Sequence, residues 1–324
     1  MATGVASYIG DEMMQTSVRT DNHEDQVATH DVIRELRAVG GQLQFDALLP
    51  AAMARKAEDA GVKKAGLDVA RMFALAVLAG AFIALGAMFA TTVTTGGADL
   101  PFGVTKLLGG LVFSLGLILV VVAGAELFTG NNLIVMAWAG GKVPTRLLLR
   151  NWIVVYAGNF AGSLVTAYLM FLSTQYTFGE GALGLNALNI ANAKSGLEFM
   201  PALVLGIFCN ALVCLAVWLV MSARTTTDKI LAIVPPITAF VAAGFEHSIA
   251  NMYFIPIGLF IQAGAAPSFW EQTGKTASDF SNLTWGNFFL ANLLPVTIGN
   301  VIGGALMVGL VYWFIYLRRE RETA

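Results

Sequence analysis

The chain has 324 residues, of which 56% are hydrophobic and 12% charged, with a mean hydropathy of +0.69. An ordinary soluble protein of this size is less apolar, so the composition predicts an integral membrane protein. The formal net charge of -2 is uninformative about nucleic acid, but no basic stripe interleaved with aromatic residues occurs, so we predict no nucleic-acid binding.

Charged residues are concentrated at the N-terminus. Residues 1–71 hold 11 Asp and Glu and 8 Lys and Arg, while all remaining positions hold only 10 acids and 11 bases. Because no apolar run with a small-residue cleavage site follows Met1, we expect no cleaved signal peptide. The expected organisation is a cytosolic tail without fixed structure (1–45), an amphipathic helical region (46–68), a transmembrane domain (69–317) and a short cytosolic tail (318–324).

The first predicted element is an amphipathic helix over residues 48–65, with Pro50 placed in its first turn. Such a helix is expected to lie at the cytosolic membrane surface. Two roles remain open for it: a gate that closes the transport path at low pH, and a simple surface anchor.

Six apolar segments are long enough to cross a bilayer core of about 30 Å, which takes about 20 helical residues. They are residues 69–92, 107–139, 147–173, 201–222, 230–263 and 286–317. The second and fifth would each be about 50 Å long as straight helices, so we expect both to be broken.

Lysine and arginine are unevenly divided between the two sets of connections. One side carries Lys63, Lys64, Arg71, Lys142, Arg146, Arg150, Arg224, Lys229, Arg318, Arg319 and Arg321, and the other only Lys106, Lys194 and Lys275. Because basic residues accumulate in cytosolic loops, both termini are predicted to be cytosolic.

The two long segments contain matching polar interruptions. GAELFTGN, from Gly124 to Asn131, and GFEHSIAN, from Gly244 to Asn251, both read G-x-E-x-x-x-x-N. The next span in each half carries G-N-x-x-G, beginning at Gly158 and at Gly299. A weaker Gly-x-Phe pattern links the first span, at Gly80 to Phe82, with the fourth, at Gly206 to Phe208.

Because the same motifs follow one another in the same order in both halves, the sequence predicts an all-α membrane protein with six transmembrane helices in an inverted three-plus-three repeat. Three spans is an odd number, so the second copy enters the membrane from the opposite side. Paired interrupted helices in such repeats point to a substrate site near the membrane midplane. Their exposed backbone must line a cavity or be buried in protein, and their helix N-termini favour an anion.

His247 is the single histidine of the membrane body, since His23 and His30 lie in the tail. One histidine excludes bis-histidine haem ligation and a zinc cluster within the chain. Cys209 and Cys214 have neither disulfide nor metal spacing, so we predict no metal and no cofactor. An ionisable side chain in a broken membrane helix instead indicates a substrate or proton pathway.

The other polar residues of the breaks are predicted to hold the structure together. Glu126 and Glu246 occupy equivalent positions and are expected to accept hydrogen bonds from exposed backbone N–H groups. The hydroxyl of Thr129 is placed to reach across to the second break. Four asparagines are expected to tie the broken ends to their neighbours: Asn131, Asn159, Asn251 and Asn300.

Long ordered motifs between residues 45 and 318 resemble the formate/nitrite transporter family. They are FDALLPAAMARKAEDAGV, FSLGLILVVVAGAELFTGN, RNWIVVYAGNFAGS, GFEHSIANMYFIPIG and NLLPVTIGNVIGGALMVGLVYWFIYLR. The resemblance implies an aquaporin-like protomer in a homopentamer of the bacterial inner membrane, with one path for formate or another small monovalent anion through each protomer.

The resemblance also implies roles for particular residues. His247 matches the central pore histidine, Thr129 its hydrogen-bonding partner, Asn210 a pore-lining asparagine and Lys194 a lysine that draws anions inward. Two apolar constrictions are implied at Phe113, Leu117, Leu127, Phe128, Val213 and Phe240.

These roles combine into a hypothesis of pH-dependent formate transport. An anion in an apolar constriction carries a large desolvation cost. Proton relay by His247, oriented by Thr129 and Asn251, would let formate cross as formic acid.

Three other interpretations remain. Gly130, Asn131 and Asn132 form a version of the first break shared with nitrite-type members, so a nitrite or hydrosulfide channel is the alternative. An enzyme using Glu246 and His247 lacks a nucleophile or metal constellation near that pair. A scaffold protein acting through residues 1–45 would belong to a third class.

Overall fold

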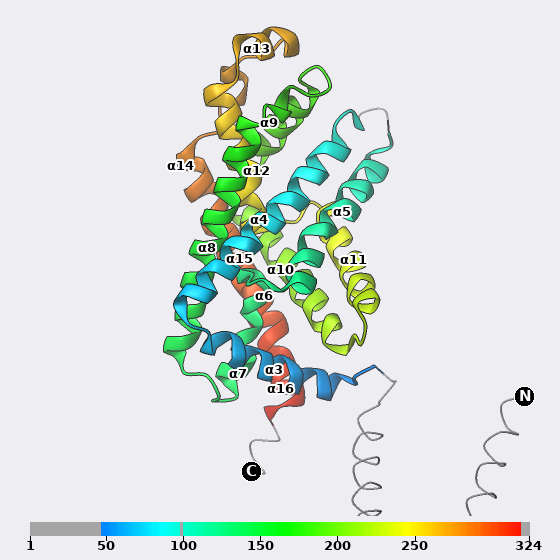
Figure 1. Ribbon diagram of the computed structural model, residues 1–324, viewed down its shortest axis with the longest axis vertical. Helices are drawn as coiled ribbons and strands as arrows, with labels where there is room; N and C mark the ends of the chain where they lie inside the picture. The colour runs from blue at the N-terminus through cyan, green and yellow to red at the C-terminus, as the bar shows by residue number, and fades with distance from the viewer. Residues whose placement is uncertain (1–46, 98–99, 319–324) are drawn as a thin grey trace, which may run out of the picture. The chain divides into compact units, whose positions relative to one another are not determined.

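The computed structural model describes residues 47–97 and 100–318, and the sequence-based expectations for the two tails lie outside them. Within the described residues every regular element is a helix, as predicted, and no strand occurs. Residues from Leu48 onward group into one unit, whose helices run between two ends of a bundle (Figure 1).

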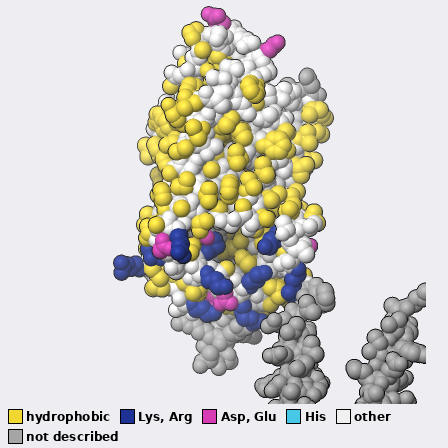
Figure 2. Space-filling model, viewed as in Figure 1, with side chains coloured by type: hydrophobic (Ala, Val, Ile, Leu, Met, Phe, Trp, Pro, Cys, Tyr) yellow, Lys and Arg dark blue, Asp and Glu magenta, His cyan; other side chains and the backbone are white. Residues whose placement is uncertain are grey.

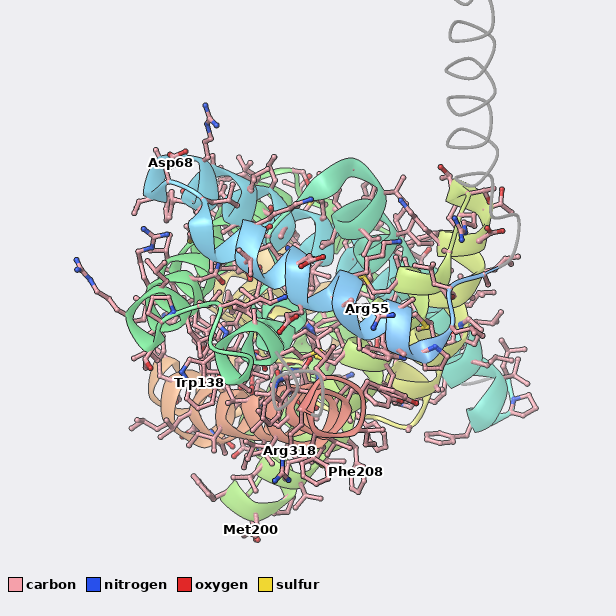
Figure 3. All side chains as sticks on the ribbon, turned by 90° about the horizontal axis from the view of Figure 1, so that it is seen from below. Arg55, Asp68, Trp138, Met200, Phe208 and Arg318 are labelled. Carbon is pink, nitrogen blue, oxygen red and sulfur yellow. The ribbon has the colours of Figure 1, made fainter. Side chains whose placement is uncertain are left out.

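Helix α3 (Pro50–Gly66) begins with Pro50 at its first turn, where the missing N–H costs no hydrogen bond. It lies across one end of the bundle (Figure 3) and contacts α7 (Val135–Ala139), α8 (Thr145–Leu172), α10 (Phe199–Ser222) and α16 (Val311–Tyr316). Small residues Ala54 and Ala57 are buried on its inner face, and Gly61 comes close to Ala137 of α7. The small side chains therefore allow α3 to lie flat against the other helices.

Six crossings can be followed along the chain. Four of them run through α4 (Val69–Thr94), α5 (Phe102–Leu119) with η2 (Val120–Gly124), α8 (Thr145–Leu172) and α10 (Phe199–Ser222). The last runs through α14 (Trp285–Asn287), η6 (Phe288–Leu293), α15 (Leu294–Val301), η7 (Ile302–Leu310) and α16 (Val311–Tyr316). These five stretches are each long and apolar enough to span a membrane. Helices α11 (Thr226–Ala242) and α12 (Ser248–Gly264), at 17 residues each, form the other crossing together.

Both predicted breaks are present. Gly124 ends η2 with φ of +84°, and Gly244 follows α11 with φ of +74°. Glycine adopts this left-handed conformation readily, which makes it a common helix terminator. The chain then restarts as α6 (Phe128–Asn131), η3 (Asn132–Ile134) and α7 (Val135–Ala139) in the first half, and as α12 in the second.

Several elements were not predicted from the sequence. Helices α9 (Ala182–Ser195) and α13 (Pro267–Thr273), with the short turns η4 (Gln175–Thr177) and η5 (Ala277–Phe280), lie outside the six spans. Helix α13 turns by 107° from α12 and lies at the end of the bundle remote from α3 (Figure 1). The sixth span is wound as a π-helix over η6 and η7.

Glycine contacts align the two halves of the repeat. A side chain on Gly162 would overlap the carbonyl of Val77, and one on Gly303 would overlap the carbonyl of Ile207. Val77 therefore corresponds to Ile207, which matches Gly80 with Asn210. The predicted equivalence of the Gly-x-Phe patterns at Gly80 and Gly206 is wrong by four residues, one helical turn.

The outer surface fits a membrane environment. Figure 2 shows apolar side chains around the middle of the bundle and Lys and Arg gathered near the α3 end. Exposed apolar side chains of the membrane-spanning helices include Ile153, Val165, Leu169 and Leu290. Together with the apolar crossings, this surface defines a multi-pass membrane protein.

Candidate functional site

The two breaks meet at His247 and Thr129. The Thr129 hydroxyl lies 3.0 Å from Nε2 of His247, and both residues are buried. The predicted reach of Thr129 across to the second break is thus confirmed. His247 stands at the start of α12, and Thr129 lies in the first turn of α6. The N-terminal N–H groups of these helices bring partial positive charge to the centre of the bundle.

The backbone fixes the orientation of the imidazole ring. The N–H of Ala250 donates to Nδ1 of His247 at 3.1 Å, so His247 caps its own helix. An accepting Nδ1 leaves the proton of the neutral ring on Nε2, which then donates to the Thr129 hydroxyl. Asn251 was expected to orient the ring, but its amide donates to Glu246 and Asn292 instead.

Glu126 is held by an ammonium and an amide. Its carboxylate accepts from Nζ of Lys64 at 2.7 Å and from Nδ2 of Asn131 at 2.6 Å. Asn131 also donates to Oδ1 of Asn151 at 2.9 Å, and Asn151 donates to the backbone carbonyl of Lys64. The network therefore fixes both the side chain and the backbone of the lysine.

Glu246 has the same surroundings in the second half. Its carboxylate accepts from Nζ of Lys194 at 2.7 Å and from Nδ2 of Asn251 at 2.6 Å. Asn251 donates to Oδ1 of Asn292 at 2.7 Å, and Asn292 donates to the backbone carbonyl of Lys194. The internal repeat thus extends to individual hydrogen bonds.

Asparagines, not glutamates, satisfy the exposed backbone of the breaks. Oδ1 of Asn159 accepts from the N–H of Phe128, and its Nδ2 donates to the carbonyls of Ala76 and Glu126. Asn300 repeats this pattern with Ser248, Gly206 and Glu246. The role expected for the glutamates is filled by these amides, because an amide can accept and donate together whereas a carboxylate only accepts.

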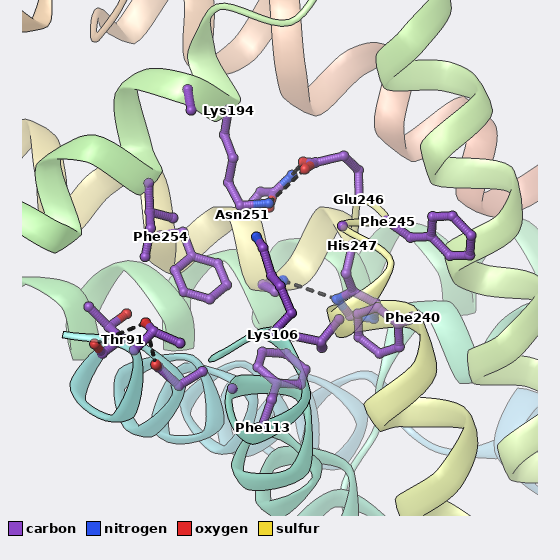
Figure 4. A pocket seen from close by; sticks show the side chains of 18 of the residues that line it. Thr91, Lys106, Phe113, Lys194, Phe240, Phe245, Glu246, His247, Asn251 and Phe254 are labelled. Carbon is purple, nitrogen blue, oxygen red and sulfur yellow. Dashed lines mark hydrogen bonds and ion pairs between the residues drawn. The ribbon is translucent and has the colours of Figure 1, made fainter. Parts of the chain in front are cut away.

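A cavity of about 580 Å³ lies on the side of the pair remote from α3. His247, Glu246 and Lys194 line it together with Phe113 and Phe240 (Figure 4). The two phenyl rings meet edge to face with centroids 5.6 Å apart. We call this cavity the outer vestibule.

A second cavity, of about 450 Å³, lies on the α3 side and is called here the inner vestibule. It is lined by Lys64, Glu126, Leu117 and Leu127. Each vestibule is therefore lined by a lysine–glutamate pair and by apolar residues from the set that the resemblance assigns to constrictions.

Three other residues assigned by resemblance lie outside the lining of both vestibules. Val213 is buried. The ring of Phe128 packs against Tyr156 at 4.9 Å, beside an apolar groove on the outer face. Asn210 is fully buried and donates to Asn132 and to the carbonyls of Thr129 and Asn300, so it ties the two halves together.

Sequence reasoning missed Lys64, Asn151 and Asn292. The signal for the asparagines was available, because each stands eight residues before the asparagine of a G-N-x-x-G motif, Asn159 or Asn300. Lys64 gave no comparable signal in the sequence, although it stands 130 positions before Lys194, the offset that also relates Val77 to Ile207. Helix α9 is therefore the counterpart of α3 in the second half.

Matched broken helices, charged vestibules and a central polar pair define a membrane transport protein built from an inverted repeat. The family model for formate/nitrite transporters matches residues 51–314, and the chain belongs to this family. It is a family of transporters, not of enzymes.

Relatives of known name support the same assignment. The chain is 52% identical to formate channel FocA of Escherichia coli (strain K12), over 85% of this chain and 97% of that protein. It is 44% identical to formate channel FocA of Haemophilus influenzae, over 83% and 94%. A solved structure of a pentameric formate channel with formate bound has a TM-score of 0.74 and 48% identity, covering 77% of this chain and 98% of that one.

Proposed function

We propose that this protein is a pH-dependent formate channel of the bacterial inner membrane. The observation that carries the proposal is the buried pair of Thr129 and His247, which stands between two vestibules that each contain a lysine. The formate channels named above, at 52% and 44% identity, support the choice of substrate.

Transport would proceed through proton transfer at His247. Ammonium groups and half-helix N-termini favour an anion in a vestibule, whereas the apolar constriction penalises its charge. Protonation would remove that penalty and let the substrate pass as a neutral acid. Because Nδ1 of His247 accepts the N–H of Ala250, a doubly protonated ring requires that this hydrogen bond be released. We therefore infer that the relay is coupled to a local opening at the start of α12.

The alternative substrates are nitrite and hydrosulfide. This alternative was prompted by Gly130, Asn131 and Asn132. Asn132 is fully buried and lies outside the lining of both vestibules, whereas Gly130 and Asn131 line the inner vestibule. The preference for formate is therefore supported by the named relatives and not by this segment.

One liposome experiment tests the proposal. Formate flux is measured at several pH values for the wild type and His247→Phe, and nitrite and hydrosulfide are added as competitors. We expect formate to be the preferred substrate and the variant to lose the pH dependence. An unchanged pH profile in the variant would exclude the relay, and stronger competition by nitrite or hydrosulfide would exclude formate as the main substrate.

The assembly and orientation are also proposals. We infer a homopentamer from the pentameric relative, with 69–317 as the channel domain of each protomer and 46–68 as its cytosolic surface helix. The basic residues near α3 support the proposal that this end, and both terminal segments (1–45 and 318–324), are cytosolic. Labelling of single cysteines at Lys229 and Lys275 with an impermeant maleimide in intact cells checks this, since only the one at position 275 should react. Native mass spectrometry checks the five-copy assembly.

A further inference from the structure

The charges of the outer vestibule do not balance. Its lining contains two ammonium groups, of Lys106 and Lys194, and one carboxylate, of Glu246. Lys194 is committed to Glu246 at 2.7 Å, with its side chain only 18% exposed. An ammonium paired in this way presents little net charge to an approaching anion, because the neighbouring carboxylate repels that anion.

Lys106 has no such partner among the described residues. It stands in the second turn of α5, and its one recorded contact among the described residues is with the ring of Phe102, 5.5 Å from Nζ. A ring face attracts a cation only weakly at an exposed site, and Phe102 is 78% exposed. Figure 4 shows Lys106 among the side chains that line this cavity.

Most other hydrogen-bond donors of the outer vestibule are already engaged. The hydroxyls of Thr91, Thr94 and Thr105 donate to backbone carbonyls. The amide of Asn186 donates to α4. Among the described side chains that line the cavity, those of Asn189 and Lys106 have donors that make no hydrogen bond or ion pair, and Asn189 is exposed. A carboxylate entering the vestibule thus meets an uncommitted ammonium and an uncommitted amide before it reaches His247.

We propose that Lys106, assisted by Asn189, forms a capture site for small monovalent carboxylates in the outer vestibule, ahead of the apolar pair Phe113 and Phe240. Lys194 then serves mainly to neutralise and position buried Glu246. This inference rests on the proposed transport of formate and adds a binding step to it. Charge in a cleft with low-dielectric walls raises the local concentration of an oppositely charged ligand, so capture controls flux at low substrate concentration.

The test measures formate flux into proteoliposomes over a range of concentrations for Lys106→Gln, Lys106→Arg and the wild type. Lys106→Gln is expected to raise the half-saturating concentration on the order of fivefold to tenfold with an unchanged maximal flux. Lys106→Arg should restore it, because the charge returns. The matched control is Lys275→Gln, which removes an exposed lysine that does not line the vestibule and should have no effect.

Two further arms separate capture from other causes. The difference in half-saturating concentration between the wild type and Lys106→Gln should shrink as the concentration of an impermeant salt is raised to about 0.5 M. At that concentration the salt screens charges beyond a few ångströms. Asp99 lies outside the described residues, and Asp99→Asn should leave the half-saturating concentration unchanged. A lower half-saturating concentration in Asp99→Asn would overturn the claim that Lys106 is uncompensated.

The outcomes distinguish this inference from the proposed function. A wild type that does not conduct formate refutes the proposed function itself. If the wild type conducts formate and the half-saturating concentration of Lys106→Gln lies within twofold of the wild-type value, the capture site alone is overturned. The capture site is also overturned if Lys106→Gln lowers only the maximal flux, because that result places Lys106 in the translocation step.

Discussion

At the scale of single residues, the two halves of the repeat differ at the centre of the protein, and the proposed proton transfer takes place where they differ. The repeat places Leu127 opposite His247 and Ile249 opposite Thr129, so each half contributes one polar residue where the other has an aliphatic one. The two polar residues then meet at 3.0 Å, and both are buried. A hydrogen bond is stronger in such a low-dielectric interior than in water.

Replacing Thr129 with valine tests the value of this contact. Valine keeps the shape but removes the oxygen that partners Nε2 of His247, leaving a buried donor unpaired at a cost of about 1–3 kcal/mol. We expect formate flux to fall roughly tenfold or more, as follows from that cost. Thr129→Ser keeps the hydroxyl and should retain most of the flux. Equal losses in the valine and serine variants would show that packing, not the hydrogen bond, is what matters.

A second prediction at the residue scale concerns the ion pair of Lys194 and Glu246. The carboxylate is buried and the pair is closed at 2.7 Å, so Lys194→Met leaves an unpaired charge inside the protein. Loss of one partner of a buried pair costs about 3–5 kcal/mol. In thermal unfolding experiments in detergent, the melting temperature of Lys194→Met should be much lower than that of the wild type. Adding Glu246→Gln to this variant should recover part of the lost melting temperature. If the double variant is less stable than the single one, the penalty does not come from the uncompensated carboxylate.

At the scale of the helices, glycine sets how closely the repeats pack. Gly162 in α8 faces the backbone of α4, and Gly303 in η7 faces the backbone of α10, with no room for a β-carbon at either position. Close backbone approach of this kind is the usual packing mode of membrane helices. The equivalent contacts on the two sides explain why the two halves share a similar architecture.

Gly162→Ala and Gly303→Ala should therefore destabilise the protein by similar amounts. Each added methyl would push two helices apart, and overpacking of this kind costs about 1–3 kcal/mol. Gly103→Ala is the matched control, because a side chain there meets nothing within 4 Å and alanine favours the helix. Melting temperatures in detergent should fall for the first two variants only. A similar fall in the control would argue against the packing explanation.

At the scale of the whole molecule, sequence patterns predicted the broken spans because backbone breaks need particular residues. Gly124 and Gly244 supply the left-handed turn, and Asn159 and Asn300 satisfy the freed backbone groups, so both repeats leave a visible motif. Helix α9 left none, since its 14 residues are too short for a membrane span. The pairing of Lys64 with Glu126 was equally invisible, because it joins residues 62 positions apart that no motif links.

Helix α3 is tied to the rest of the described chain by several polar contacts, and Arg150 donates to the carbonyl of Ala65 near its end. Lys56 donates to the carbonyl of Met221, Glu58 pairs with Lys142, and Lys64 reaches Glu126 in the inner vestibule. Protonation of Glu58 or Glu126 would remove an ion pair that holds α3. Release of the helix would also withdraw the ammonium of Lys64 from the vestibule, so the gating and anchoring roles of α3 make different predictions for flux at low pH.

A disulfide can decide between those roles. A β-carbon at Gly61 would lie 3.2 Å from that of Ala137, near the spacing that a disulfide requires, so Gly61→Cys with Ala137→Cys should lock α3 onto α7. Because the packed arrangement keeps Lys64 in the inner vestibule, we expect the oxidised variant to conduct formate normally at neutral pH. If α3 is a gate, oxidation should also abolish the decrease of flux at low pH, and reduction should restore it. Each single-cysteine variant serves as a control. An identical decrease in the oxidised and reduced forms would assign α3 the role of an anchor, since a helix held covalently in place cannot close a path by moving.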